Sequence, residues 1–349
     1  MKLLILTQKI DIKDDVLGFF HNWVKEFSQN CGKITVVALG VGEYNLPENV
    51  KVLSLGKERG SSKIKYILNF YKYIWRERKN YDKVFIHMNQ EYVVLGGLLW
   101  KIFGKKIFLW RNHAKGDFFT DLAVFLSNKV FCTSGFSYTA KFSKTKLMPA
   151  GIETDYFVNL NHSAEEGKIN LLFLGRISPV KDLETLIKSL AIIRKEDEKF
   201  FLNIIGEASE RDNGYFEKMR KLVVDLGLEK YVKFWGRASY GKTLEFYNRN
   251  DVFINLTKSG SFDKTILEAM SCEKMVLTCN QSFLDVFPKD WRDIMIFKEE
   301  DPEDLAEKIT SLCRMAAEKK SAIVKESRRI VKENHSLNVL AKKLFQEIK

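Results

Sequence analysis

Short apolar runs alternate with amphipathic stretches along the whole chain. The runs are KLLIL, KITVVAL, KVFIH, KIFLW and KVFCTS in the first half, and NLLFLG, FFLNIIG, YVKFWG, DVFINL and KMVLT in the second. Runs rich in Val, Ile and Phe that are separated by helical periodicity are typical of repeated βα units, whose strands lie in a parallel sheet. The pattern therefore predicts an α/β fold with one parallel sheet in each half.

The length of the chain and a polar break predict two domains. The chain has 349 residues, and single cores rarely grow beyond about 250 to 300 residues. Residues 158–168 (VNLNHSAEEGK) are polar and precede a restart of the apolar runs, so we predict the interdomain linker there. The predicted domains are residues 1–157 and 168–335. Residues 336–349 are predicted to form a final amphipathic helix.

Positive charge is concentrated in the N-terminal half. The net charge is +12, and residues 1–157 contain 24 basic and 14 acidic residues, a net charge of +10. Such asymmetry favours a polyanionic partner: nucleic acid, an anionic membrane surface or a phosphorylated substrate. A charge that merely keeps the protein soluble is the alternative.

Cysteine usage and hydropathy predict a cytoplasmic protein. The five cysteines are scattered and include no C-x-x-C pair, which indicates neither a disulfide framework nor a zinc site. The apolar start is too short for a signal peptide, and the longest apolar run, residues 93–100, is far below the roughly 20 residues that a spanning helix needs. We therefore expect no membrane-spanning segment.

Residues 236–243 (GRASYGKT) match the phosphate-binding pattern G-x-x-x-x-G-K-[ST] and follow an apolar run. A P-loop ATPase or kinase, with Lys242 on the phosphates, is therefore one hypothesis. Such enzymes also need a second apolar strand that ends in Asp to hold magnesium, and none of the predicted strands ends that way. The alternative is an ordinary turn between a strand and a helix.

Two cations follow a strand of the second half. The run at residues 171–174 ends in GRISPVKD, which places Arg176 and Lys181 at the carboxyl end of a strand, where open α/β sheets bind ligands. Further along, the chain leaves another strand through Ser259-Gly260-Ser261 into a helix that begins at Lys264. The free backbone N–H groups of a first helical turn form an anion site. Each feature taken singly also fits a solvated turn or an exposed helix face.

In order and spacing, these segments resemble the second domain of retaining family-four glycosyltransferases (glycosyl transferases group 1), which have the GT-B fold. The matching segments are NLLFLGRISPVKDLETLI, FLNIIGEAS, LGLEKYVKFWGRAS, DVFINL and SFDKTILEAMSCEKMVLT, with weaker matches at LMPAGIETDYF and LWRNH. The resemblance implies two Rossmann-like domains that face each other across a cleft. It also implies that GRASYGKT is the family's turn after a strand.

The resemblance implies a role for individual residues. Arg176 and Lys181 match the pair that grips the donor diphosphate, and Glu268 matches the second carboxylate of the E-x7-E motif, which accepts hydrogen bonds from the ribose. His113 matches the cleft histidine near the transferred sugar, although a packing role is an equal alternative. The catalytic candidates are therefore His113, Arg176 and Lys181, and the nucleotide-sugar-binding candidates are Gly175, Arg176, Lys181, Gly206, Ser261, Phe262, Asp263, Lys264, Thr265, Ile266 and Glu268.

One position departs from the family's pattern. The first carboxylate of E-x7-E should stand eight residues before Glu268, where this chain has Gly260, so the donor sugar is left open and a non-catalytic binding relative is a further alternative. Asp263 is expected to cap the helix that begins at Lys264. The family needs no metal or other cofactor, and the sequence shows no D-x-D at a strand end.

Basic and aromatic residues interleave over residues 63–79, and lysines recur over residues 101–106. Basic amphipathic helices with aromatic residues are typical of membrane-surface elements, although a helix with a solvated basic face fits equally. No nucleic-acid-binding module is found by sequence. The resemblance thus implies a retaining, metal-independent glycosyltransferase of cell-envelope polysaccharide or glycolipid synthesis, in which the helix of residues 336–349 crosses back to the N-terminal domain. The expected donor is a UDP-, GDP- or ADP-sugar, and the expected acceptor is a saccharide or a lipid-linked saccharide. The protein is expected to bind peripherally to the inner face of the membrane.

Overall fold

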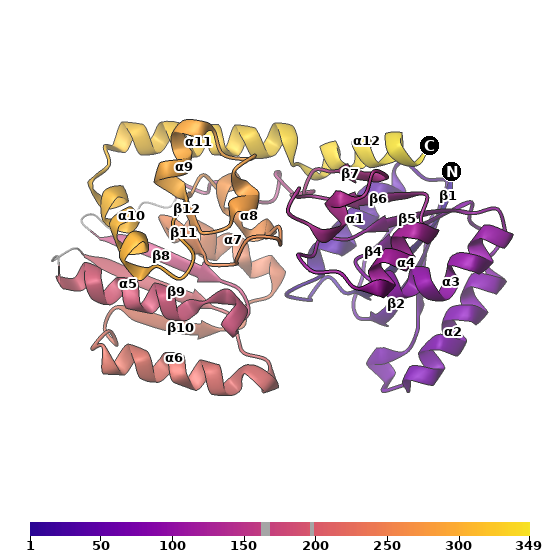
Figure 1. Cartoon of the computed structure of the whole chain (residues 1–349), viewed down its shortest axis with the longest axis horizontal. Helices are drawn as coiled ribbons and strands as arrows, with labels where there is room; N and C mark the ends of the chain where they lie inside the picture. Colours follow the sequence, from indigo (N-terminus) through magenta and orange to yellow (C-terminus); the bar gives the residue numbers. More distant parts are fainter. Residues whose placement is uncertain (162–167, 196–198) are drawn as a thin grey trace. The chain divides into compact units, whose positions relative to one another are not determined.

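The computed structural model describes residues 1–161, 168–195 and 199–349. Contacts divide the chain into two compact units, residues 1–151 with 337–349, and residues 152–336 (Figure 1). Part of the linker predicted at residues 158–168 lies outside the described residues. Among the described residues, no helix is both long enough and apolar enough to cross a bilayer.

The first unit is built on a seven-stranded parallel sheet. The strand order is β3-β2-β1-β4-β5-β6-β7, and neighbouring strands pair in parallel. The strands are β1 (Lys2–Ile10), β2 (Lys33–Val41), β3 (Val50–Ser54), β4 (Lys83–His87), β5 (Lys106–Trp110), β6 (Lys129–Cys132) and β7 (Thr145–Leu147). The central strands are nearly continuous apolar runs because helices cover both faces of the sheet.

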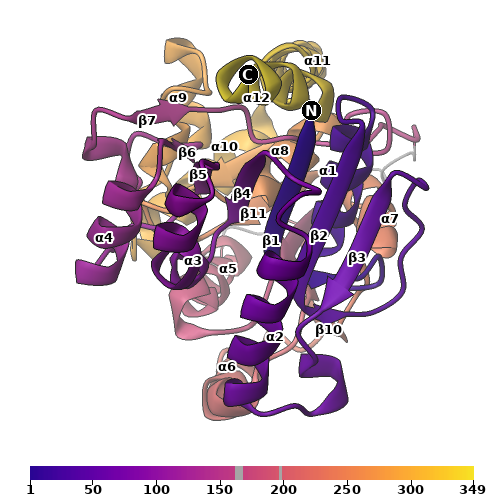
Figure 2. The same ribbon diagram turned by 90° about the vertical axis from the view of Figure 1, so that its right-hand side faces the viewer.

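The helices of the first unit form two layers. Side chains of α1 (Gly18–Ser28) and α12 (Leu337–Ile348) pack into the core on one face of the sheet. Side chains of α2 (Lys63–Arg76), α3 (Gln90–Ile102) and α4 (Phe118–Leu126) pack into a second core on the other face. Figure 2 shows α2, α3 and α4 side by side.

The second unit is built on a five-stranded parallel sheet with the order β10-β9-β8-β11-β12. Its strands are β8 (Ile169–Leu174), β9 (Phe200–Ile205), β10 (Val232–Gly236), β11 (Val252–Asn255) and β12 (Met275–Thr278). Its helices are α5 (Leu183–Lys195), α6 (Asn213–Asp225), α7 (Tyr240–Asn248), α8 (Lys264–Ser271), α9 (Lys289–Met295), α10 (Pro302–Arg314) and α11 (Ala317–Asn334). Both units are therefore Rossmann-like, as the sequence predicted.

The contact boundary falls after Gly151, whereas the sequence analysis ended the first domain at residue 157. The intervening residues pack within the second unit. Ile152 forms a β-bridge with Ser336, and the ring of Phe157 lies 5.6 Å from Tyr240 and 5.8 Å from Tyr247. A polar composition marks where regular elements stop, but it does not show which core the flanking aromatic residues join.

Candidate functional site

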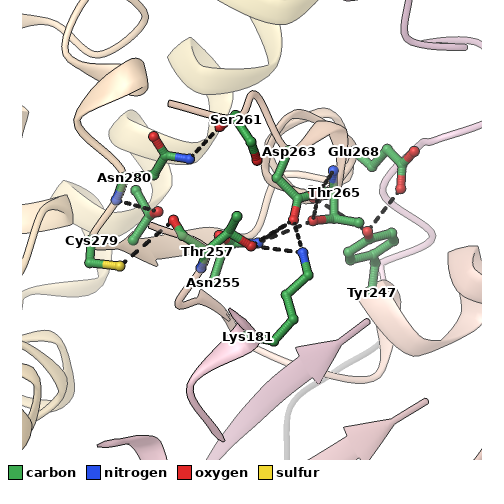
Figure 3. A network of polar contacts seen from close by, with 11 residues as sticks. Lys181, Tyr247, Asn255, Thr257, Ser261, Asp263, Thr265, Glu268, Cys279 and Asn280 are labelled. Atoms are coloured by element: carbon green, nitrogen blue, oxygen red, sulfur yellow. Dashed lines mark hydrogen bonds and ion pairs between the residues drawn. The ribbon is translucent and has the colours of Figure 1, made fainter. Parts of the chain in front are cut away.

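The strand order of the second unit reverses between β8 and β11. From β8 the chain proceeds outward to β9 and β10, and it then returns to the other side of β8 for β11 and β12. Loops diverge at such a switch point and leave a crevice at the carboxyl ends of the strands, where open α/β sheets bind ligands. The loops after β8 and β11 carry most of the candidate residues (Figure 3).

Two candidate glycines allow the loops after β8 and β9 to approach closely. Gly206 has a φ of 144°, and a Cβ atom placed on it would lie 1.9 Å from the carbonyl oxygen of Gly175. Only glycine fits there. Gly175 and Gly206 therefore shape the edge of the sheet, with bare backbone beside Arg176.

The two candidate cations have different surroundings. The Lys181 ammonium donates hydrogen bonds to Thr257 Oγ1 at 2.7 Å and to Asp263 Oδ2 at 2.5 Å (Figure 3). Arg176 is exposed, and within the described part of the chain no carboxylate forms an ion pair with it. Lys181 is thus held in a fixed position, whereas the guanidinium of Arg176 faces solvent.

Asp263 is the centre of the polar network. Its Oδ1 accepts hydrogen bonds from the backbone N–H of Thr265 at 3.3 Å and from Thr265 Oγ1 at 2.8 Å, which makes Asp263 the N-cap of α8, as predicted. Its Oδ2 accepts from Lys181, from Asn255 Nδ2 and from Thr257 Oγ1. Burial alone would raise the pKa of Asp263, but the charge and hydrogen bond of Lys181 prevail and lower it. The carboxylate is therefore ionised at neutral pH.

Glu268 lies on α8 and is 7% exposed. Tyr247 donates a hydrogen bond to its Oε2 at 2.9 Å. Burial raises the pKa of Glu268 to about 7, against the hydrogen bond from Tyr247 and the charge of Lys264, which lower it. Burial also lowers the pKa of Lys264. In this conformation Glu268 is thus a buried, hydrogen-bonded carboxyl rather than an exposed helix-face residue.

The backbone at position 260 has a conformation that favours glycine. Gly260 is buried and has a φ of 102°, a conformation that is strained for any residue with a side chain. The loop is held on either side, because Glu299 accepts hydrogen bonds from the N–H and hydroxyl of Ser259, and Asn280 donates to the carbonyl of Ser261 at 2.6 Å. The ring of Phe262 stacks on Phe283 with centroids 4.4 Å apart.

Residues 159–330 match the model of the protein family "Glycosyl transferases group 1". The match covers nearly all of the second unit. Over these residues the chain matches the group 1 glycosyltransferases. Relatives of this glycosyltransferase include an uncharacterised glycosyltransferase of Methanocaldococcus jannaschii, 26% identical over 285 residues, 77% of each chain. The D-inositol 3-phosphate glycosyltransferase of Pseudarthrobacter chlorophenolicus is 28% identical over 144 residues, which span 39% of this chain and 34% of that one.

Solved structures establish the GT-B fold of this glycosyltransferase. Anabaena HepE in complex with UDP and glucose superposes with a TM-score of 0.79 at 17% identity, over 99% of this chain and 98% of HepE. The sucrose-phosphate synthase of Thermosynechococcus elongatus gives the same TM-score at 15% identity, over 99% of this chain and 98% of that one.

The ATPase alternative is not favoured for this glycosyltransferase. The loop of residues 236–239 follows β10, an edge strand far from the switch point. Thr243, which would bind magnesium in a P-loop, donates its hydroxyl to the carbonyl of Tyr240 at 2.7 Å, and Lys242 is exposed. Within the residues described, no three His, Cys, Asp or Glu side chains gather in a way that would hold a metal ion.

His113 lies in the first unit, while every other candidate lies in the second. It follows β5, and its side chain is exposed. Its Nδ1 accepts a hydrogen bond from the backbone N–H of Lys115 at 3.0 Å. The imidazole of His113 is therefore exposed and bonded within its own loop, and both the site role and the packing role stay predictions.

Several residues of the network were not among the sequence candidates. Asn255 and Thr257 hold Asp263 from the end of β11, Tyr247 holds Glu268, and Tyr240 donates a hydrogen bond to Glu153 at 2.7 Å. Polar residues directly after a buried strand were a usable signal for Asn255 and Thr257. The tyrosines lie on α7 and gave no such signal, because their contacts depend on how the helices pack.

Proposed function

We propose that this glycosyltransferase transfers a sugar from a nucleotide-sugar donor to a saccharide or lipid-linked saccharide acceptor, with retention of anomeric configuration and without a metal. The observation that carries the proposal is the pair of cations that follows β8 at the switch point, where Lys181 also bonds to the N-cap of α8 and Arg176 is exposed. The likeness to HepE, solved with UDP and with UDP-glucose, supports a nucleotide-sugar donor. So does the family match over the second unit.

The cations act on the leaving group. When the glycosidic bond to the donor breaks, negative charge develops on the departing diphosphate. Preorganised positive groups at that place stabilise the transition state more than the ground state. Lys181 is already fixed by Thr257 and Asp263, so it loses little freedom when the diphosphate binds. Arg176, which is exposed, closes on the diphosphate from solvent and can bind two of its oxygens at once.

Nucleotide binding tests the donor site. Calorimetry with UDP, GDP and ADP should identify the base, and Arg176→Ala or Lys181→Ala should weaken the preferred nucleotide by at least roughly tenfold, about 1.4 kcal/mol. Lys242→Ala is the matched control, because it removes an exposed lysine from α7. The affinity of this variant for the preferred nucleotide should equal that of wild type. Unchanged affinity in both site variants would contradict the proposal, and loss of ATP binding in Lys242→Ala would restore the P-loop hypothesis.

Turnover tests the reaction itself. A panel of UDP-, GDP- and ADP-sugars with a lipid-extract acceptor should give a product whose anomeric configuration, read by NMR, equals that of the donor. Addition of EDTA should leave the rate unchanged. A chain that binds a nucleotide but turns over none of the donors would instead be a binding-only relative.

The proposal also places the enzyme on an anionic membrane surface in the cytoplasm. α2 contains four basic residues and no acidic residue, and only Phe70 and Ile74 of this helix are buried. Large apolar side chains project from α2, α3 and α4 into solvent: Ile64, Leu68, Trp75, Leu98, Ile102 and Phe125. An anionic bilayer matches both properties, because lysines meet the headgroups while apolar side chains enter the interface. The alpha-monoglucosyldiacylglycerol synthase of Streptococcus pneumoniae, 26% identical over 160 residues, 42% of this chain and 35% of that one, supports a lipid acceptor.

A further inference from the structure

Arg111 is a half-buried cation, and no carboxylate within residues 1–161, 168–195 and 199–349 forms an ion pair with it. It follows β5 in the first unit, and its Nη1 donates a hydrogen bond to Gln90 Oε1 at 2.6 Å, and its Nη2 to the carbonyl of Lys115 at 3.3 Å. Among the described residues, Arg111 Nε is buried without an acceptor. Glu91 and Asp117 act on the guanidinium only at longer range, and burial lowers its pKa. A partly buried charge without an ion pair is costly, and an anionic ligand would supply the missing partner.

The loop around Arg111 is also held by hydrogen bonds that do not involve the guanidinium. Asn112 Nδ2 donates to Thr133 Oγ1 at 2.9 Å, and the backbone N–H of Thr133 donates back to Asn112 Oδ1 at 2.6 Å. Thr139 donates its hydroxyl to the carbonyl of Arg111 at 3.0 Å. The loop therefore does not depend on the guanidinium alone, and the structural bonds of Arg111 leave its Nε without an acceptor among the described residues.

The neighbouring strand end is strained and holds an unmatched acceptor. Met88, directly after β4, has a φ of 68°, unusual for a residue with a side chain, and its N–H bonds the carbonyl of Trp110 at 2.7 Å. Such strain is concentrated at binding and catalytic sites. In the described part of the chain, the buried Oδ1 of Asn89 has no hydrogen-bond donor. Asn89 precedes Gln90, the residue that holds Arg111.

Local charge favours an anion at this edge. Lys115 is exposed in the loop that follows Arg111. The carboxylate of that loop, Asp117, is engaged as the N-cap of α4, where it accepts from the N–H of Thr120 at 2.8 Å. The loop therefore carries two cations and one carboxylate, a net positive charge, and the carboxylate is engaged in the helix cap.

We propose that the carboxyl edge of β4 and β5 binds an anionic saccharide as acceptor, with Arg111 pairing with its phosphate or carboxylate group and Asn89 accepting a hydrogen bond from one of its hydroxyl groups. This inference rests on the proposed function and names the substrate class. Arg111 suits the task because a planar guanidinium that is oriented by Gln90 presents several N–H groups to planar or tetrahedral oxyanions. A neutral sugar would leave the charge of Arg111 unmatched.

Binding of small probes to the whole protein tests the inference. The probes are glucose 6-phosphate, glucuronate and glucose, with UDP measured in parallel. In wild type, at least one charged probe should bind roughly tenfold more tightly than glucose, about 1.4 kcal/mol, and the tighter of the two identifies phosphate or carboxylate. Arg111→Gln should abolish this preference, whereas the control Lys101→Gln, an exposed lysine on α3, should keep it. UDP affinity should stay the same in all variants.

Two further variants keep the test decisive. Arg111→Lys retains the charge and should give intermediate affinity, which guards against misfolding of Arg111→Gln. Asn89→Ala should weaken the binding of glucose 6-phosphate but leave the binding of inorganic phosphate unchanged. The inference is overturned if charged probes bind no better than glucose, or if Arg111→Gln keeps the preference while it still binds UDP. If wild type does not bind UDP, the result would contradict the proposed donor site instead.

Discussion

At the scale of single residues, the ion pair between Lys181 and Asp263 sets the charge that a donor meets. The pKa of Asp263 is lowered, so its carboxylate cancels much of the charge that Lys181 would offer to a diphosphate. Asn is as good an N-cap as Asp, so Asp263→Asn removes the charge and preserves the cap of α8. We expect this variant to bind UDP several-fold more tightly by calorimetry.

A double-mutant cycle isolates the cause. If Asp263 opposes the donor mainly by neutralising Lys181, the gain from Asp263→Asn should be much smaller in a Lys181→Ala background. An equal gain in both backgrounds would show direct repulsion between Asp263 and the phosphates. Weaker UDP binding in Asp263→Asn would show instead that Asp263 acts by positioning Lys181.

The raised pKa of Glu268 predicts a pH dependence of stability. Because the pKa in the folded state is about 7, against 4.5 as the ordinary value, the buried carboxyl favours folding most when it is protonated. This contribution is fully present below about pH 4.5 and is lost as the pH rises to about 7, a change on the order of 3 kcal/mol. Relative to Glu268→Gln, wild type should therefore lose thermal stability across this window.

The control for this titration is Glu229→Gln, which changes an exposed glutamate of the same unit. Its thermal midpoint should follow that of wild type at every pH. A constant difference between wild type and Glu268→Gln from pH 4.5 to 7 would mean that Glu268 stays ionised throughout.

The sequence predicted those site residues whose placement is local. Arg176 and Lys181 follow one strand directly, and the cap at Asp263 involves only the next helical turn. The pairing of Lys181 with Asp263 joins residues 82 positions apart, and it arises because β11 lies beside β8. A local sequence pattern does not give the order of the strands in the sheet. The contact between Lys181 and Asp263 could therefore not be predicted from it. Gly260 has a positive φ that glycine adopts without strain, and no local pattern in the sequence indicated this conformation.

At the scale of elements, α2 gives the test of membrane contact. Lys63, Lys65 and Lys72 are exposed or half-buried on this helix, and Ile64 and Leu68 are 72% and 64% exposed. Changing the three lysines to Glu should strongly reduce sedimentation with vesicles of anionic phosphatidylglycerol, and salt should reduce binding of wild type, because the Debye length is about 8 Å at 0.15 M. Ile64→Ser with Leu68→Ser should reduce binding that persists at high salt.

Two controls match these changes. Reversal of Lys319, Lys325 and Lys332 on α11 alters net charge equally on exposed side chains of the second unit, and Val224→Ser removes an exposed apolar side chain from α6. Both should bind vesicles as wild type does. Equal binding of wild type to anionic and neutral vesicles would remove the membrane from the proposal.

The elements that the sequence pattern found are those with a strong apolar signal. All ten apolar runs are strands, and they include the central strands of both sheets. The edge strands β3 and β7 were not predicted, because they are short and contain Lys51 and Lys146. Lysines are common on edge strands. Helices α9, α10 and α11 were also not predicted. No apolar strand follows them, so the alternation of strands and helices that indicates βα units is absent there.

At the scale of the whole molecule, the C-terminal helix α12 belongs to the first unit, although the chain reaches it from the second. The buried face of α12 includes Leu340, Leu344 and Ile348, and the ring of Phe345 lies 5.6 Å from that of Phe27. Lys129 forms an ion pair with Glu347 at 2.9 Å. The core of the first unit is therefore completed only by the last residues of the chain.

This arrangement predicts that a change in α12 destabilises the first unit alone. Leu344→Ala removes a fully buried side chain and should lower the free energy of unfolding of that unit by about 2 to 5 kcal/mol, whereas Lys342→Ala on the exposed face of the same helix should have almost no effect. Hydrogen exchange read by mass spectrometry separates the units: β1 and β4 should lose protection in Leu344→Ala, while β8 and β11 keep theirs. UDP affinity, which we assign to the second unit, should remain at the wild-type value. Equal loss of protection in both sheets would mean that the two units unfold as one cooperative body, and α12 would then stabilise the whole chain rather than the core it completes.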